Sequence, residues 1–103
     1  LSSTALRNLI SDEVEAMLKE HLPKEISIVV SEQDEAAVAS LLNATRALSE
    51  ISLTAKNTLS DGQAFISCAD GQRKVDVGQA ISDIQSTIEA FLTQPELERA
   101  NAV

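Results

Sequence analysis

Aromatic residues are almost absent from this sequence, with only Phe65 and Phe91 and neither tryptophan nor tyrosine. A domain without aromatic platforms offers no stacking surface for nucleobases or sugar rings. The core must be aliphatic instead, because hydrophobic residues make up 44% of the 103 residues. Such a fraction indicates a folded chain, and this length suffices for one domain with one core and little room for a deep cleft.

Basic residues are also few. The sequence has eight lysines and arginines and sixteen aspartates and glutamates, which gives a net charge of −8. A surface of this sign repels phosphate backbones and anionic lipid headgroups. The longest apolar runs, such as residues 36–39, are far too short to span a bilayer. We therefore expect no nucleic-acid ligand and no direct membrane insertion.

Cysteine and histidine occur once each, as Cys68 and His21. An intrachain disulfide is excluded, which fits a reducing, cytosolic setting. The two residues are far apart in the chain and match no zinc-binding spacing, and the three glycines form no phosphate-binding motif. The sequence therefore predicts no catalytic residue, no cofactor and no metal. Whether His21 meets Cys68 cannot be read from the sequence, and we interpret Cys68 as a core residue rather than a nucleophile.

Two segments have the apolar spacing of amphipathic helices. The first covers residues 4–22 and ends before Pro23. The second begins after Asp76, a predicted N-cap with Gln79 as its reciprocal partner, and precedes Pro95. We expect both helices to shield one face of a sheet, so Ile81→Asp would unfold the domain. The two stripes are Leu6, Leu9, Ile10, Val14, Met17, Leu18 and Leu22, and Val77, Ile81, Ile84, Ile88, Phe91 and Leu92.

Alternating apolar residues predict strands over 26–30, 51–55 and 63–69, with a short returning strand near Val75. Between the first two strands, Ser31 and Asp34 have the spacing of a capping box that opens another helix. Asp70-Gly71 predicts a hairpin turn. The predicted fold is therefore α+β, with a small mixed sheet of three to four strands, one helix between the first two strands, and a helix at each end.

The chain begins with Leu1, and its only methionine is Met17, so we expect a fragment of a longer protein. Residues 1–22 are interpreted as the end of a longer helical region, 23–95 as a globular domain, and 96–103 as a flexible tail. Gln72, Arg73 and Lys74 follow the hairpin turn and hold the only adjacent basic pair. They are the predicted contact with a protein partner.

The order of these motifs resembles the C-terminal domain of the FliH family of flagellar export proteins. That family includes the injectisome stator proteins (SctL, YscL, HrpE) and, more distantly, the peripheral-stalk E subunit of V-type ATPases. The resemblance rests on three features in order. A Val/Ile strand over Ile26 to Val30 is followed by Asp34, Leu59 and Gly62 match a Leu-x-x-Gly pattern, and Gly71 precedes the pair Val75-Asp76.

The resemblance implies a stator that binds and restrains the export ATPase through the ATPase's N-terminal region and helps dock it at the export gate. It also implies a cytoplasmic location at the base of a membrane-embedded apparatus, homodimerisation of the full-length protein, and contact with a cytoplasmic ring through upstream residues. The flagellar and injectisome systems are not distinguished. Two alternatives stay open: a generic interaction domain or stalk subunit of another ATPase, and a small enzyme.

Overall fold

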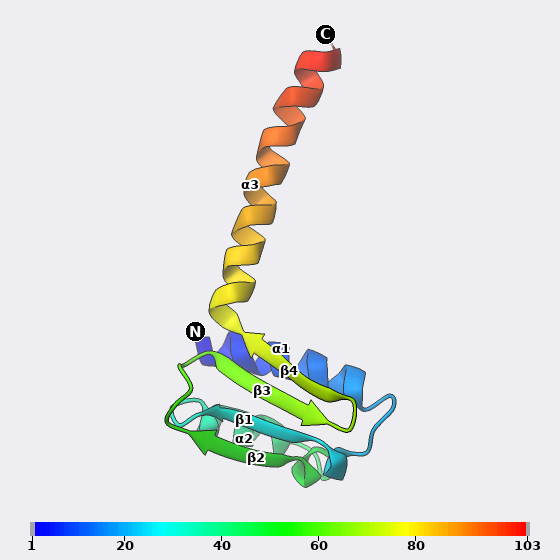
Figure 1. The fold of residues 1–103 in the computed structure, drawn as a ribbon, viewed down its shortest axis with the longest axis vertical. Coiled ribbons are helices and arrows are strands. Elements are labelled where there is room, and N and C mark those ends of the chain that lie inside the picture. The colour runs from blue at the N-terminus through cyan, green and yellow to red at the C-terminus, as the bar shows by residue number, and fades with distance from the viewer. Residues whose placement is uncertain (1, 103) are drawn as a thin grey trace.

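Three α-helices and one four-stranded sheet make up the protein, described by a computed structural model that covers the backbone of residues 2–102 and the side chains of residues 4–92 (Figure 1). Two short 3₁₀ turns lie in the connections from α1 to β1 and from α2 to β2. In chain order the elements are α1 (Ser2–Met17), η1 (Pro23–Glu25), β1 (Ser27–Ser31), α2 (Glu35–Leu42), η2 (Leu48–Glu50), β2 (Ser52–Lys56), β3 (Gln63–Cys68), β4 (Gly71–Asp76) and α3 (Val77–Ala102).

The sheet has the strand order β2-β1-β3-β4 and is mixed. β1 pairs in parallel with β2 through the crossover helix α2, and pairs antiparallel with β3, which forms a hairpin with β4. A parallel pair needs such a crossover, whereas an antiparallel pair is closed by a tight turn. The α+β class and the small mixed sheet are confirmed.

The core lies between one face of the sheet and the helices α1 and α2, which lie on the same side of the sheet in Figure 1. Alternate strand residues point into it because successive side chains of a strand face opposite ways. The opposite face of the sheet carries half-buried or exposed residues such as Val29 and Phe65. The buried hydrophobic residues are Leu6, Ile10, Val14, Met17, Ile26, Ile28, Val30, Val38, Leu42, Ile51, Ala64, Ile66, Val75 and Val77.

The helix α3 does not pack on the sheet as expected. It starts at the end of β4 and projects away from the other elements (Figure 1). The radius of gyration is 17.6 Å, whereas a compact chain of this length has about 13 Å. Of the predicted stripe only Val77 is buried, while Ile81 is 50% exposed. The prediction that this stripe covers the sheet is wrong, because α1 and α2 already occupy the apolar face.

Several element ends differ from the predictions. α1 stops at Met17 rather than at residue 22, and Leu22 is 56% exposed instead of buried. α3 runs through Pro95 to Ala102. The tail predicted for residues 96–103 lies beyond the side chains that the structure describes.

Candidate functional site

The exposed apolar surface on α3 contains five of the six exposed large hydrophobic residues in the described part of the chain. Its five residues recur at intervals of three and four, so they share one face of the helix. Isolated exposed apolar residues are ordinary, but a contiguous row of this size is typical of a protein-binding surface. We call this row the α3 stripe: Ile81, Ile84, Ile88, Phe91 and Leu92, exposed by 50%, 58%, 51%, 68% and 63%.

The positions beside the α3 stripe are neutral or acidic. Gln85 and Thr87 flank it without charge, and Asp83 and Glu89 supply the charged groups of this part of the helix. The Asp83 side chain accepts a hydrogen bond from Nε2 of Gln79 at 2.9 Å. An apolar row with acidic neighbours suits an amphipathic segment that carries basic residues.

The start of α3 is fixed by Asp76, the predicted N-cap. Its Oδ1 accepts the backbone N–H of Gln79 at 3.1 Å, and its Oδ2 accepts Nε2 of Gln63 at 3.0 Å. The hydrogen bonds from Gln63 and Gln79 lower the pKa of the Asp76 carboxyl, although its partial burial acts in the opposite direction. The cap is confirmed, but Gln79 is not its reciprocal partner, because the Gln79 side chain bonds Asp83 instead.

A second polar group, Asp34, joins segments that are far apart in the sequence. Its side chain is fully buried, and Oδ2 accepts the backbone N–H of Gly62 at 2.7 Å and the hydroxyl of Ser31 at 3.0 Å. The Ser31 hydroxyl also accepts the Asp34 backbone N–H at 3.2 Å. The predicted capping box at Ser31 does not start α2, however, because the N-cap of this helix is Asp34 itself, without a side-chain cap hydrogen bond. The carboxylate therefore connects α2 with the loop before β3.

Gly62 connects that loop with α3. Its carbonyl accepts the backbone N–H of Val77 at 2.8 Å. Its φ of +82° favours glycine, and a Cβ there would lie 3.3 Å from Cβ of Val77. Asp34 and Gly62 therefore bond each other, and Gly62 also bonds Val77, the residue that follows Asp76.

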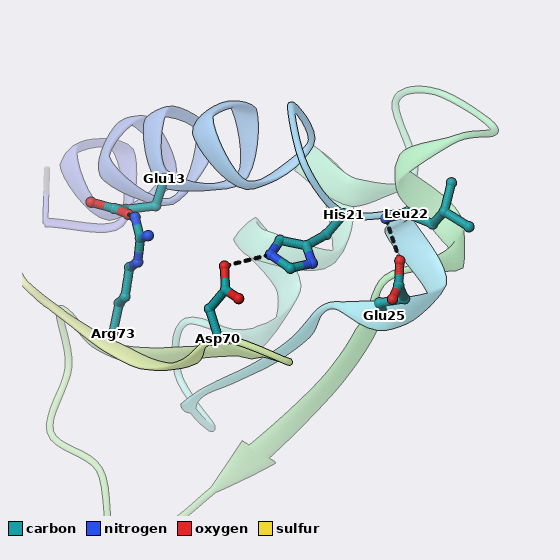
Figure 2. Close-up of polar contacts among 6 residues, drawn as sticks. All are labelled: Glu13, His21, Leu22, Glu25, Asp70 and Arg73. Carbon is teal, nitrogen blue, oxygen red and sulfur yellow. Dashed lines mark hydrogen bonds and ion pairs between the residues drawn. The ribbon is translucent and has the colours of Figure 1, made fainter.

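The structure also brings His21, Cys68 and Asp70 together. One ligand atom from each of the three lies within 4.8 Å of the other two. Nε2 of His21 and Oδ2 of Asp70 are 2.8 Å apart, as the dashed line in Figure 2 shows. The His21 side chain is 12% exposed and that of Asp70 is 59% exposed, while Cys68 packs against the edge of the core. We call these residues the His-Cys-Asp cluster.

The pairing of the strands explains why this cluster forms. β1 runs antiparallel to β3 with Ser27 opposite Ser67, so the chain just before β1 lies beside the chain just after β3. His21 is held there by its backbone hydrogen bond to the Met17 carbonyl at 2.9 Å. The argument against a metal site used the separation of His21 and Cys68 along the chain. In the folded chain these two residues lie close together.

The predicted interface residues Gln72, Arg73 and Lys74 are exposed on β4, an edge strand. They do not act as one group. Lys74 and Gln72 lie across from Phe65 and Ser67 of β3 and border the sheet face that the helices leave open. Arg73 instead forms an ion pair with Glu13 of α1 at 3.0 Å (Figure 2).

The hairpin that precedes them lies at the predicted place but differs in its turn. Ala69 and Asp70 form the two-residue loop, and Cys68 pairs with Gly71. Among the described residues only glycines have positive φ, and here it is Gly71, at +132°. The positive φ therefore follows the turn instead of lying at its centre, so this is not the primed turn that Asp-Gly favours.

Sequence reasoning missed the two features that now carry the functional argument. The α3 stripe was found by its spacing but interpreted as core. The His-Cys-Asp cluster could not be predicted without knowing that β1 pairs with β3. The sequence did indicate the two segments that form it, through the hairpin signal at Asp70-Gly71 and the predicted helix end before Pro23.

Comparison with protein-family models, with curated proteins and with solved structures finds no match for this chain. None of the helices in the described part of the chain combines the length and the apolarity that a membrane crossing requires.

Proposed function

We propose that this chain is the ATPase-binding domain of a stator subunit in a flagellar or type III protein export apparatus. In this role it binds and restrains the export ATPase and helps dock it at the export gate. Upstream residues would contact the cytoplasmic ring and form the homodimer, at the base of the membrane-embedded apparatus.

The α3 stripe carries the proposal. A row of large aliphatic side chains and one phenylalanine in water is unfavourable by about 25 cal/mol per Å² of apolar surface, so a partner that covers it gains that free energy. The row lies on a helix that projects from the domain, where a second helix can reach it along its length. Helix-in-groove recognition uses anchor residues at this spacing.

The polar connection among Asp34, Gly62 and Val77 is a second observation that supports the proposal. Each motif alone is common, but here their backbone and side-chain groups bond one another and set where α3 begins. The stator therefore needs these residues to aim α3 at its partner.

The partner segment is an amphipathic helix from the N-terminal region of the export ATPase. Its apolar side would cover the α3 stripe, and its basic flanks would face Asp83 and Glu89. Since the whole chain carries a net charge of −8, the association rate should fall as salt concentration rises.

The test measures binding of the purified export ATPase by the wild-type chain and two variants of α3. Ile84→Glu places a charge inside the α3 stripe, whereas Ser86→Glu places the same charge on the same helix away from the stripe. We expect Ile84→Glu to weaken binding by roughly 30-fold or more, the loss typical of a central interface residue, and Ser86→Glu to bind like the wild type.

Two results would count against the proposal. Failure of the wild type to bind the ATPase at low salt would remove the stator function and leave a generic interaction domain. Equal binding by Ile84→Glu and the wild type, with helical circular dichroism unchanged, would move the interface away from the α3 stripe.

A further inference from the structure

We propose that His21, Cys68 and Asp70 form a binding site for a borderline divalent cation of the Zn²⁺ class. The His-Cys-Asp cluster supplies an imidazole nitrogen, a sulfur and a carboxylate oxygen from two segments, with their ligand atoms within 4.8 Å of one another. Three protein ligands of these types with an open fourth position are typical of zinc sites.

The donor set selects the class of metal. Thiolate and imidazole favour Zn²⁺ over Mg²⁺ and Ca²⁺, which prefer oxygen ligands throughout. Metal–ligand bonds of about 2.0–2.3 Å require the donor atoms of a tetrahedral site to lie roughly 3–4 Å apart. The present separations need only a small adjustment, in which the cation replaces the hydrogen bond between His21 and Asp70.

The exposure of the three side chains favours a metal over a cysteine nucleophile. In a nucleophilic triad the carboxylate is buried behind the imidazole, and the nucleophile faces the substrate. Here the burial of the two side chains is the opposite, because Asp70 is 59% exposed while Cys68 packs against the core. A cation tolerates this arrangement, since its open position can face solvent on the Asp70 side.

Binding would proceed without any redox partner. The Cys68 thiol releases its proton to solvent as its sulfur bonds the cation, and neutral His21 and ionised Asp70 donate lone pairs. The cation would then tie the end of α1 to the β3–β4 hairpin. Because it binds the folded chain, the melting temperature should rise as free Zn²⁺ increases.

The test titrates the metal-free chain with Zn²⁺ by calorimetry, with Mg²⁺ as the comparison ion. We expect Zn²⁺ to bind one site and Mg²⁺ not to bind it. Cys68→Ser and His21→Gln should each weaken Zn²⁺ binding at least roughly 100-fold, since loss of even an outer partner of a metal ligand costs 10–100-fold. Asp12→Asn, an exposed acid on α1, is the matched control and should bind like the wild type.

Two measurements on the wild type do not depend on the folding of any variant. Co²⁺ should produce a thiolate-to-metal charge-transfer band, and Zn²⁺ should slow the labelling of Cys68 by a thiol reagent. Absence of that band, unchanged labelling, or Zn²⁺ affinity in folded Cys68→Ser equal to the wild type would each overturn the proposal.

Discussion

At the scale of single residues, Asp76 shows how one carboxylate ends a strand and starts a helix. It is the last residue of β4 and caps α3 through the backbone N–H of Gln79. Gln63 of β3 bonds its other oxygen, so the cap is also tied to the sheet. These contacts favour the ionised form, which makes the stability of the domain depend on pH.

The pKa of Asp76 is lower in the folded chain than its usual value. Ionised Asp76 therefore stabilises the fold above the unfolded pKa of about 4, and that contribution is lost as pH falls through the lower folded value. We expect the free energy of unfolding of Asp76→Asn to decline less than that of the wild type between roughly pH 5 and pH 2, because asparagine still caps α3. Urea titrations at each pH measure this difference, and parallel curves for the two proteins would contradict it.

Some residue roles were readable from the sequence because they follow from local chemistry. Asp76 was predicted as an N-cap, and its carboxylate accepts the Gln79 backbone N–H as expected. Ser31 was expected to begin a capping box, but the N-cap of α2 is Asp34. The bond from Gly62 to Asp34 was not readable, since it joins two loops whose approach depends on how β1 and β3 pair. The same dependence concealed the contact between His21 and Asp70.

At the scale of elements, periodicity located the helices and strands but could not say what each apolar face contacts. The alternation in β3 placed Ala64 and Ile66 toward the core correctly. The pattern of α3 is equally clear, yet its stripe faces solvent, because a helix stripe packs on a sheet only where that face is free. Apolar residues at intervals of three and four indicate a helix face that packs against something. The pattern is the same whether that face packs within its own domain or against another protein.

Ile81 and Ile10 provide a direct test of this difference. Both are isoleucines on helices, but Ile10 is fully buried and Ile81 is 50% exposed. We expect Ile10→Asp to prevent cooperative folding, because a buried unpaired charge costs several kcal/mol and a domain of this size has little more to lose. Ile81→Asp should change the unfolding free energy by less than about 1 kcal/mol.

Thermal melting monitored by circular dichroism separates the two variants. Loss of a cooperative transition in Ile81→Asp at low protein concentration would mean that α3 packs on the domain in solution, as the sequence alone suggested. An Ile10→Asp protein that melts like the wild type would place α1 outside the core.

At the scale of the whole molecule, the folded body and the projecting helix have separate tasks. α1 supplies Leu6, Ile10, Val14 and Met17 to the core, so it belongs to the body even if a longer helical region precedes it. Apart from Val77, the described part of α3 adds no residue to that core. The body should therefore fold without most of α3 but not without α1.

Two truncations test this division. A chain of residues 1–80 should melt within a few degrees of the full chain, since the core ends at Val77. A chain of residues 23–103 should show no cooperative transition, because it loses four buried side chains worth about 1.5–3 kcal/mol each. Cooperative melting of the second chain, followed by calorimetry, would contradict the assignment of α1 to the body.

The attachment of α3 at one end has a mechanical consequence. Its 26 residues extend about 40 Å, while Asp76 and the Gly62 carbonyl bond backbone N–H groups of its first turn. A force applied to α3 far from Asp76 therefore acts with a long lever on the first turn of the helix. A small rotation at this turn displaces the other end of α3 by several ångströms. A partner bound to α3 would therefore move while the sheet keeps its position.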